Sequence, residues 1–214
     1  HPENQFKSIH ATGTNGKGST CAMIESVLRT AGYRTALYTS PHLYTFNERI
    51  QINRVPMFDE ELASLVKEIR ELCEREHIEP TFFEFTTALA FLYFARANID
   101  IAVIEVGMGG LYDATNVITP LVSVITNVGL DHTEYFGPTK IHVAREKAGI
   151  IKERVPVVTN ENDLGIIKIF EDEATAKHTK VICVSDVVDA SILSADLDGQ
   201  EVEVQIYGGE KFTV

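Results

Sequence analysis

The sequence has few cysteines and no long apolar run. Its three cysteines, Cys21, Cys73 and Cys183, are far apart and form no CxxC pair. This sparse, odd-numbered set argues against a disulfide scaffold or a thiolate zinc site and is typical of the reducing cytosol. No apolar run approaches the ~20 residues that a membrane helix needs, and no signal peptide opens the chain. We therefore expect a cytoplasmic protein with no membrane partner. Because the chain begins at His1 and not at methionine, we expect it to start inside a longer sequence.

The chain has fewer basic residues than acidic ones. The chain has 19 Lys and Arg against 31 Asp and Glu, which gives a formal net charge of −12. A nucleic acid is therefore not an expected partner, because phosphate backbones require clustered Lys and Arg. A small anionic substrate is still compatible with this charge, since a local pocket can be positive inside an acidic protein.

Short apolar runs alternate with longer helical patterns over most of the 214 residues, of which 44% are hydrophobic. Six β-branched runs predict buried strands: Phe6–Ala11, Thr35–Tyr38, Ile99–Glu105, Val122–Asn127, Val155–Val158 and Val181–Val184. Five segments between them predict helices: Lys17–Ala31, a helix capped by Asp59, Phe82–Asn98, Thr139–Gly149 and Leu164–Lys177. This alternation predicts an α/β fold with a mostly parallel P-loop-type sheet, helices on both faces and ligands at the carboxyl ends of the strands.

The apolar positions of two helices predict the faces that they bury. In the first helix these positions are Ile24, Val27, Leu28 and Ala31, before a stop at Gly32. In the helix after Asp59 they are Leu62, Leu65, Ile69 and Leu72. In both sets each position has another three or four residues away, as one buried stripe requires.

The C-terminal segment follows a different pattern. Residues 192–214 alternate apolar and polar side chains around Asp198-Gly199 and Gly208-Gly209, which are hairpin turn signals. We predict one domain over residues 1–190, followed by a small antiparallel ribbon, or the start of a link to a further domain, over 191–214.

The run from Thr12 to Thr20, Thr-Gly-Thr-Asn-Gly-Lys-Gly-Ser-Thr, joins a predicted strand to a predicted helix, as a phosphate-binding loop does. Its glycines let backbone N–H groups turn toward phosphate oxygens, and the helix adds its positive N-terminal end. Lys17 can place an ammonium on the β- and γ-phosphates. The loop is not the usual Walker A, because Ala11 replaces its first Gly and Gly18 separates Lys17 from Ser19. The predicted ATP-binding residues are Thr14, Asn15, Gly16, Lys17, Gly18, Ser19 and Thr20.

This variant loop resembles the ATP loop of folylpolyglutamate and dihydrofolate synthases and, more loosely, of the wider Mur ligase superfamily. The similarity covers roughly residues 5–160 and rests on four further runs: Tyr38–Leu43 with Phe46–Ile50, Ile104–Gly110, Leu130–Thr133 and Arg145–Ile150. It implies that residues 1–190 are the N-terminal ATP-binding domain of such an enzyme, with ATP and Mg²⁺ as cofactors.

The resemblance also implies a metal site. The positions matching Ser40, Glu105 and His132 bind Mg²⁺ in the family, and the position matching Lys147 is a carbamylated lysine. Mg²⁺ is usually held by one or two carboxylates plus phosphates, and a carbamate on Lys147 would attract it where an ammonium would repel it. The predicted catalytic residues are Lys17, Lys147 and His132. Taken alone, His132 and Lys147 could be ordinary polar residues, and Glu105 could cap a helix.

Two segments resemble those that line the family's folate pocket. The predicted folate-binding residues are Phe82, Phe83, Glu84, Tyr112, Asp113, Ala114 and Asn116. Aromatic rings can stack on a flat pterin, and Asp and Asn can read its donors and acceptors. Alternatively, Phe82, Phe83 and Phe85 are core residues of a buried helix. Leu111 and Tyr112 stand where the family pattern has Arg-Leu, which removes a guanidinium.

The resemblance implies a Mg-ATP-dependent ligase that adds glutamate to tetrahydrofolate, or to dihydropteroate, through an acyl phosphate. Its partners are then the folate, L-glutamate and a missing C-terminal domain of the same chain, which supplies a His-Asn-Pro motif absent here. We expect a monomer and a fragment that is inactive alone. The alternatives are a Mur-type peptidoglycan precursor ligase, a non-catalytic nucleotide-binding module, and a P-loop kinase or GTPase, which the missing Gly at Ala11 disfavours.

Overall fold

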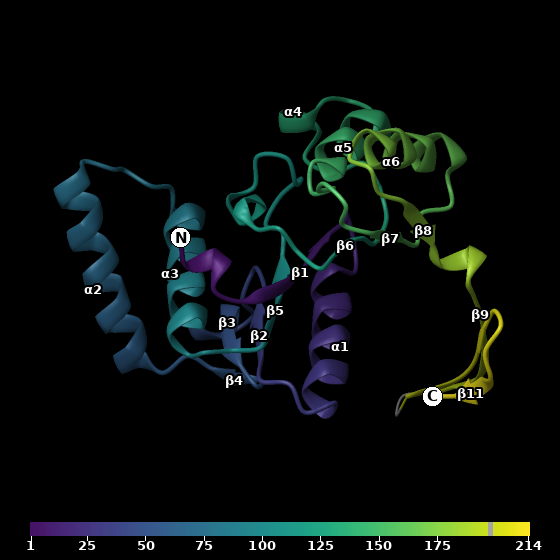
Figure 1. Ribbon diagram of the computed structural model, residues 1–214, viewed down its shortest axis with the longest axis horizontal. Coiled ribbons are helices and arrows are strands. Elements are labelled where there is room, and N and C mark those ends of the chain that lie inside the picture. The colour runs from purple at the N-terminus through teal and green to yellow at the C-terminus, as the bar shows by residue number, and fades with distance from the viewer. Residues whose placement is uncertain (197–198) are drawn as a thin grey trace.

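The computed structural model describes residues 1–196 and 199–214, which form two separate sheets (Figure 1). The larger sheet has the strand order β4-β3-β2-β5-β1-β6-β7-β8. Its strands are β1 Lys7–Thr12, β2 Thr35–Tyr38, β3 Ile50–Ile52, β4 Val55–Pro56, β5 Ile101–Glu105, β6 Val122–Ile125, β7 Val157–Thr159 and β8 Val181–Cys183. The pairs from β2 through β8 are parallel, which confirms the predicted α/β class.

The six predicted strands are present, with ends shifted by one or two residues. The antiparallel hairpin of β3 and β4 at the sheet edge was not predicted. Its two-residue turn holds Asn53 and Arg54 at φ angles of 50° and 66°. Such turns are usually signalled by Asn-Gly or Asp-Gly, and Asn-Arg gave no comparable signal.

The five predicted helices are present, with ends shifted by at most two residues, and the short helix α4 was not predicted. They are α1 Lys17–Thr30, α2 Asp59–Glu76, α3 Phe82–Arg96, α4 Thr133–Phe136, α5 Lys140–Ala148 and α6 Leu164–Ala176. Four short 3-10 helices are η1 Pro2–Asn4, η2 Phe46–Arg49, η3 Ala114–Val117 and η4 Val184–Asp186. The prediction that Asp59 caps α2 was wrong. Phe58 is the N-cap residue, and Asp59 is the first residue of the helix, where its charge favours the N-terminal end.

The predicted buried stripe of α1 was partly wrong. Val27 is 69% exposed and Ala31 is also exposed, whereas Cys21 and Glu25 are fully buried. Ile24 and Leu28 do pack against the core beside Cys21, so the helix buries two of the four predicted positions together with Glu25. Its buried acid is compensated, because Glu25 accepts hydrogen bonds from Thr35 Oγ1 at 2.6 Å and from Arg29 Nε at 3.1 Å. In α2, Leu72 likewise faces solvent.

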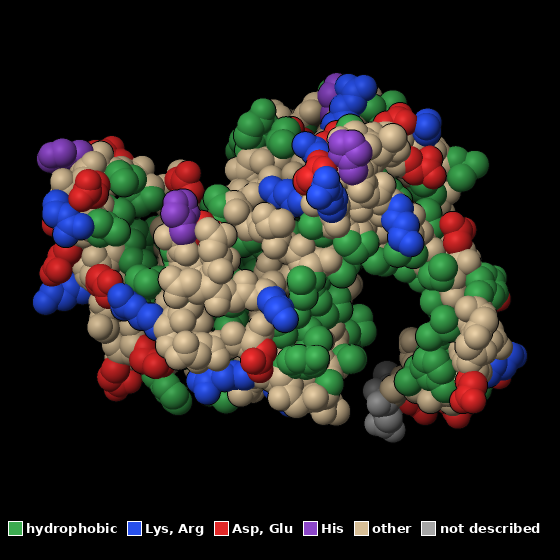
Figure 2. All heavy atoms as spheres, in the orientation of Figure 1, with side chains coloured by type: hydrophobic (Ala, Val, Ile, Leu, Met, Phe, Trp, Pro, Cys, Tyr) green, Lys and Arg blue, Asp and Glu red, His purple; other side chains and the backbone are tan. Residues whose placement is uncertain are grey.

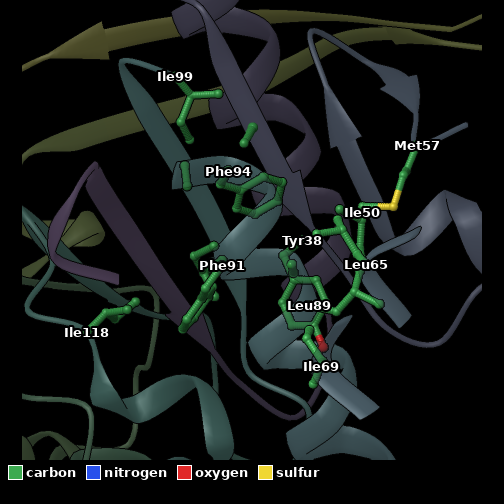
Figure 3. Close-up of a cluster of buried hydrophobic side chains, with 14 residues drawn as sticks. Tyr38, Ile50, Met57, Leu65, Ile69, Leu89, Phe91, Phe94, Ile99 and Ile118 are labelled. Carbon is green, nitrogen blue, oxygen red and sulfur yellow. The ribbon is translucent and has the colours of Figure 1, made fainter. Parts of the chain in front are cut away.

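Alternation along the strands divides the core between the two faces of the sheet. Ala36, Tyr38, Ala102 and Ile104 point to the side covered by α2 and α3, where they pack with Leu89 and Phe94 of α3 (Figure 3). Leu37 and Val103 point to the opposite side and pack with Cys21 of α1. This is the period of two that a strand imposes. A third cluster lies between α5, α6 and the strands β6 and β7.

The C-terminal segment forms the predicted antiparallel ribbon, in three strands: β9 Val188–Ala195, β10 Gln200–Ile206 and β11 Lys211–Thr213. It begins at Val188, earlier than the alternation indicated, and the domain division at residue 190 stays a prediction. The turn at Gly208-Gly209 is present, with Gly208 at a φ of 79°. Asp198 of the other predicted turn lies outside the described residues. Among the described helices, none is long and apolar enough to cross a bilayer.

Candidate functional site

The glycine-rich loop lies between β1 and α1 and is tied to the segment after β6. Thr14 N–H donates to the carbonyl of Asn127 at 3.1 Å, and Thr126 Oγ1 donates to the carbonyl of Asn15 at 2.6 Å. The approach is so close that a Cβ on Gly13 would lie 1.8 Å from Thr126 Oγ1. Gly16 then caps α1 at a φ of 78°, a left-handed conformation suited to glycine. Sequence reasoning missed Thr126, because its role depends on the spatial neighbourhood of β1 and β6.

Lys17 is the first residue of α1 and turns back over the loop. Its Nζ donates to the carbonyls of Gly13 at 2.9 Å and Thr14 at 3.5 Å. The ammonium is thus held beside the glycine-rich loop. Ser19 and Thr20 follow in the first turn of the helix, and Ser19 is exposed.

Glu105 ends β5 and is 4% exposed. Its Oε2 accepts a hydrogen bond from the backbone N–H of Ser40, which follows β2, at 2.9 Å. A Cβ on Gly18 would lie 3.5 Å from the same oxygen, so the carboxylate sits beside the start of α1. Burial raises the pKa of Glu105, while the Ser40 N–H and the Lys17 ammonium act against that rise. The parallel sheet thus brings Lys17, Ser40 and Glu105 together, as the sequence predicted.

Lys147, in the last turn of α5, is 2% exposed. Within the described chain its ammonium has no hydrogen-bond or ion-pair partner. Burial and the charge of Lys17 lower its pKa to about 8, with Asp131 acting in the opposite direction. A larger neutral fraction makes this amine a better nucleophile than an ordinary lysine.

A cavity of about 890 Å³ opens in front of these groups. Its walls include Lys17, Ser40 and His132, together with Phe82, Phe83, Glu84, Tyr112, Asp113 and Ala114. The cavity is thus bordered by nearly all of the residues predicted for folate, by two of those predicted for the metal, and by Lys17 of the glycine-rich loop, whereas Glu105 and Lys147 do not line it. His132 is half-exposed at the N-cap of α4, with Nε2 3.6 Å from Asp131 Oδ1.

The aromatic residues of α3 have different environments. Phe82 is 63% exposed at the cavity wall. Phe83 lines the cavity and also packs against the core. Its ring lies so close to Gly107 that a Cβ there would be 2.4 Å away. Phe85 packs against the core and does not line this cavity. Glu84 accepts hydrogen bonds from the Thr81 N–H and Oγ1, at 2.7 and 2.8 Å, and these lower its pKa. Its carboxylate therefore caps α3.

Asn116 does not line the cavity. Its Nδ2 donates to the carbonyls of Leu111 and Gly149, both at 3.0 Å, so the side chain ties the loop after β5 to the end of α5. Leu111 stands where a guanidinium was expected. It packs directly against Gly149 at the end of α5, so closely that a Cβ on Gly149 would lie 2.4 Å from the Leu111 Cα.

Sequence reasoning also missed a buried chain of hydrogen bonds behind Asp113. His10 of β1 is fully buried, and its Nε2 lies 2.8 Å from Thr115 Oγ1. Thr115 Oγ1 donates in turn to Asp113 Oδ1. Because the hydroxyl has only one proton, His10 Nε2 must carry the donor proton. His10 Nδ1 is left buried without a partner.

The side chains around Glu105 fit a magnesium ion better than a metal that needs a full protein cage. In the described residues no group of three or more His, Cys, Asp or Glu side chains could hold a metal by themselves. Glu105 instead offers one buried carboxylate whose second oxygen accepts no hydrogen bond, near Ser40 and beside the phosphate loop. This donor set suits Mg²⁺, which combines one or two carboxylates with phosphate and water oxygens.

Comparison with known proteins agrees with this arrangement. Residues 11–214 match the family described as the Mur ligase middle domain. The chain is 46% identical over 179 residues to dihydrofolate synthase/folylpolyglutamate synthase of Bacillus subtilis, covering 81% of this chain and 42% of that protein. It is 42% identical over 219 residues to folylpolyglutamate synthase of Lacticaseibacillus casei, covering 100% of this chain and 49% of that protein.

The fold is also similar to a solved structure described as an FPGS–AMPPCP–folate complex. The TM-score is 0.90 at 39% sequence identity, over 100% of this chain and 54% of that one. The chain therefore spans about half the length of the relatives that it matches.

Proposed function

The chain belongs to the family of Mur ligase middle domains, and from this premise we propose that it is the ATP-binding part of a folylpolyglutamate synthase. The reaction joins L-glutamate to tetrahydrofolate at the expense of ATP. One observation carries the proposal: Lys17, directly after the glycine-rich loop, lines the same cavity as Ser40, His132 and the wall of Phe82 and Asp113. A nucleotide and a second substrate can therefore meet there.

The chain's own groups bind and orient the triphosphate. The N–H groups of Thr14 and Asn15 are bonded to Asn127, so the Lys17 ammonium and the N–H groups at the N-terminal end of α1 are the donors that face the phosphates. The residues that would hold Mg²⁺ are Ser40, Glu105, His132 and a carbamylated Lys147, and the bound ion would neutralise phosphate charge. The low pKa of Lys147, about 8, supports carbamylation, because its neutral amine can add to CO₂ and release a proton.

The reaction proceeds in two steps. A carboxylate oxygen of the folate attacks the γ-phosphorus and ADP leaves, which produces an acyl phosphate. The glutamate amine then attacks the acyl carbon, phosphate leaves, and the nitrogen loses a proton to form the amide. Both steps gather negative charge around the phosphoryl group. Lys17 and the N–H groups at the N-terminal end of α1 supply the preorganised positive charge that stabilises it.

The aromatic side of the cavity is the place for the folate. The exposed faces of Phe82 and Tyr112 can stack on a flat ring system, and Asp113 can accept hydrogen bonds from it. Dihydropteroate is a second candidate for the acid substrate, because the Bacillus subtilis relative is named both dihydrofolate synthase and folylpolyglutamate synthase. The remaining half of the relatives' length supports the view that a further domain closes the site over glutamate.

The proposal is tested by a ligation assay with Lys17→Ala in the whole protein at its natural length. With ATP, Mg²⁺, glutamate and tetrahydrofolate, we expect kcat/KM to fall by about 100-fold or more, because a cation facing the developing charge is lost. Lys168→Ala is the matched control, since Lys168 lies on the surface of α6, paired with Asp172. We expect residues 1–214 alone to form no product. Ligation that survives Lys17→Ala, or efficient turnover by the isolated chain, would refute the corresponding part of the proposal.

A further inference from the structure

Arg49 is a buried cation at the edge of the cavity that none of the assigned roles uses. It ends η2, directly before β3, is 9% exposed, and lines the cavity together with Phe82 and Tyr112. Its Nε donates to His42 Nδ1 at 2.9 Å. One edge of the guanidinium is therefore occupied by a neutral acceptor, and the two Nη groups have no hydrogen-bond acceptor in the described chain.

Two aromatic rings fix the position of the guanidinium. Its Cζ lies 5.6 Å from the centroid of Phe82 and 5.9 Å from that of Phe46. These contacts, with the hydrogen bond to His42, hold the planar group before any ligand binds. Such preorganisation lowers the entropy cost of binding.

No carboxylate of the described residues neutralises Arg49, although the chain is strongly acidic. Glu48, its neighbour, accepts hydrogen bonds from the backbone N–H groups of Leu43, Tyr44 and Thr45. Glu84, an acid on the same cavity wall, is engaged by Thr81. A buried guanidinium without a counter-charge is costly. The protein tolerates that cost at a place where an anion can enter.

We propose that the Nη groups of Arg49 bind a glutamyl carboxylate of the folate substrate. This inference rests on the proposed function and adds a specific anion site to it. A planar guanidinium matches a carboxylate in a bidentate pair. The nucleotide phosphates have the Lys17 loop as their own cation site, whereas Arg49 lies against the aromatic wall assigned to the folate.

The test is a comparison of two ligands and three variants of the whole protein, with AMPPCP present to fill the nucleotide site. The ligands are folic acid and its diamide, in which both glutamyl carboxylates are neutral carboxamides. The variants are Arg49→Leu, Arg49→Lys and the control Arg34→Leu, which removes an exposed arginine that does not line this cavity. Isothermal titration calorimetry measures the Kd of each pair.

We expect Arg49→Leu to raise the Kd of folic acid by roughly 10- to 100-fold and to change the Kd of the diamide by no more than about 2-fold. For Arg49→Lys the Kd of folic acid should lie between those of the wild type and Arg49→Leu. Arg34→Leu should have the wild-type Kd. The ligand-free Tm of Arg49→Leu should stay level or rise, because an uncompensated charge is removed, whereas a merely structural arginine would lower it.

Three results would overturn the assignment: unchanged folic acid binding by Arg49→Leu, equal loss for both ligands, or a loss of AMPPCP affinity that exceeds the loss for folic acid. If the wild type binds folic acid and its diamide equally, the carboxylate site is wrong while the folate function stands. If the wild type binds neither, the proposed function itself fails, and the carboxylate assignment fails with it.

Discussion

His10, on the central strand β1, shows how burial fixes the protonation of a single side chain. It is fully buried, and burial, followed by the charge of Lys152, lowers its pKa to about 3. The ring is therefore neutral at physiological pH and donates from Nε2 toward Thr115, which in turn donates to Asp113. A residue in the core thus orients a carboxylate of the cavity.

The depressed pKa of His10 predicts acid sensitivity. In the unfolded chain histidine binds a proton near pH 6.5, whereas the folded protein binds it only near pH 3. The stability contributed by His10 is therefore complete above pH 6.5 and is lost as the pH falls toward 3, at up to about 1.4 kcal/mol per pH unit. Urea unfolding between pH 4 and 7 should show a shallower pH slope for His10→Gln than for the wild type.

The matched control is His142→Gln, which changes an exposed histidine on α5 and should keep the wild-type slope. Identical slopes for His10→Gln and the wild type would contradict the predicted role of burial. An overall loss of stability in His10→Gln does not affect this comparison, because the slope and not the absolute free energy is compared.

At the scale of elements, α1 shows how a polar contact can set the face of a helix. The apolar pattern favoured Val27 as a buried position, yet Glu25 is buried and Val27 is exposed. Glu25 joins α1 to β2 through Thr35, and to the β3–β4 turn through Arg54 at 3.8 Å. A buried carboxylate with three partners therefore positions this helix against the strands that carry the phosphate loop and Ser40.

This arrangement predicts opposite sensitivities for neighbouring positions of α1. Glu25→Ala leaves the Thr35 hydroxyl without its acceptor and Arg29 and Arg54 without their acid, so we expect the free energy of unfolding to fall by about 2–4 kcal/mol. Val27→Ala should change it by less than about 0.5 kcal/mol, because the side chain is already in solvent. Urea denaturation of both variants measures the difference. Equal effects would show that the apolar pattern, and not the buried acid, determines the packing of α1.

At the scale of the whole molecule, the two sheets differ in burial. The strands β1 and β5 are almost entirely buried between helices, whereas no described residue of β9, β10 or β11 is buried. Figure 1 shows the C-terminal sheet standing apart from the helices that cover the larger sheet. On the face shown in Figure 2, acidic and basic side chains are interspersed, with no continuous basic surface.

Hydrogen exchange should separate the two sheets. Local opening is easiest where few apolar side chains are buried, so we expect amides of β9–β11 to exchange within minutes while those of β1 and β5 stay protected for hours. Mass spectrometry of peptic peptides from the intact chain measures both, and α2 provides an internal reference of intermediate burial. Equal protection of the two sheets would mean that the C-terminal strands belong to the same cooperative unit as the larger sheet.

The sequence by itself determined the order and type of most elements. Short β-branched apolar runs and helical patterns located the six parallel strands and five of the helices, and the loop from Thr12 to Thr20 predicted a phosphate site. These features are local, since they depend on residues that are near one another along the chain. For the same reason the sequence could place Glu105 and Ser40 at strand ends, and a parallel sheet then brought those ends to one edge.

Only the tertiary structure decided which side chains are isolated from water and which groups complete their contacts. The burial of Arg49 without a counterion, the chain from His10 to Asp113, and the tie between Thr126 and Asn15 all join segments distant in sequence. Lys147 has a lowered pKa because it is buried and near Lys17, which no spacing along the chain specifies. Desolvation and electrostatic interaction depend on distances in space, and these exist only once the strands have paired and the helices have packed.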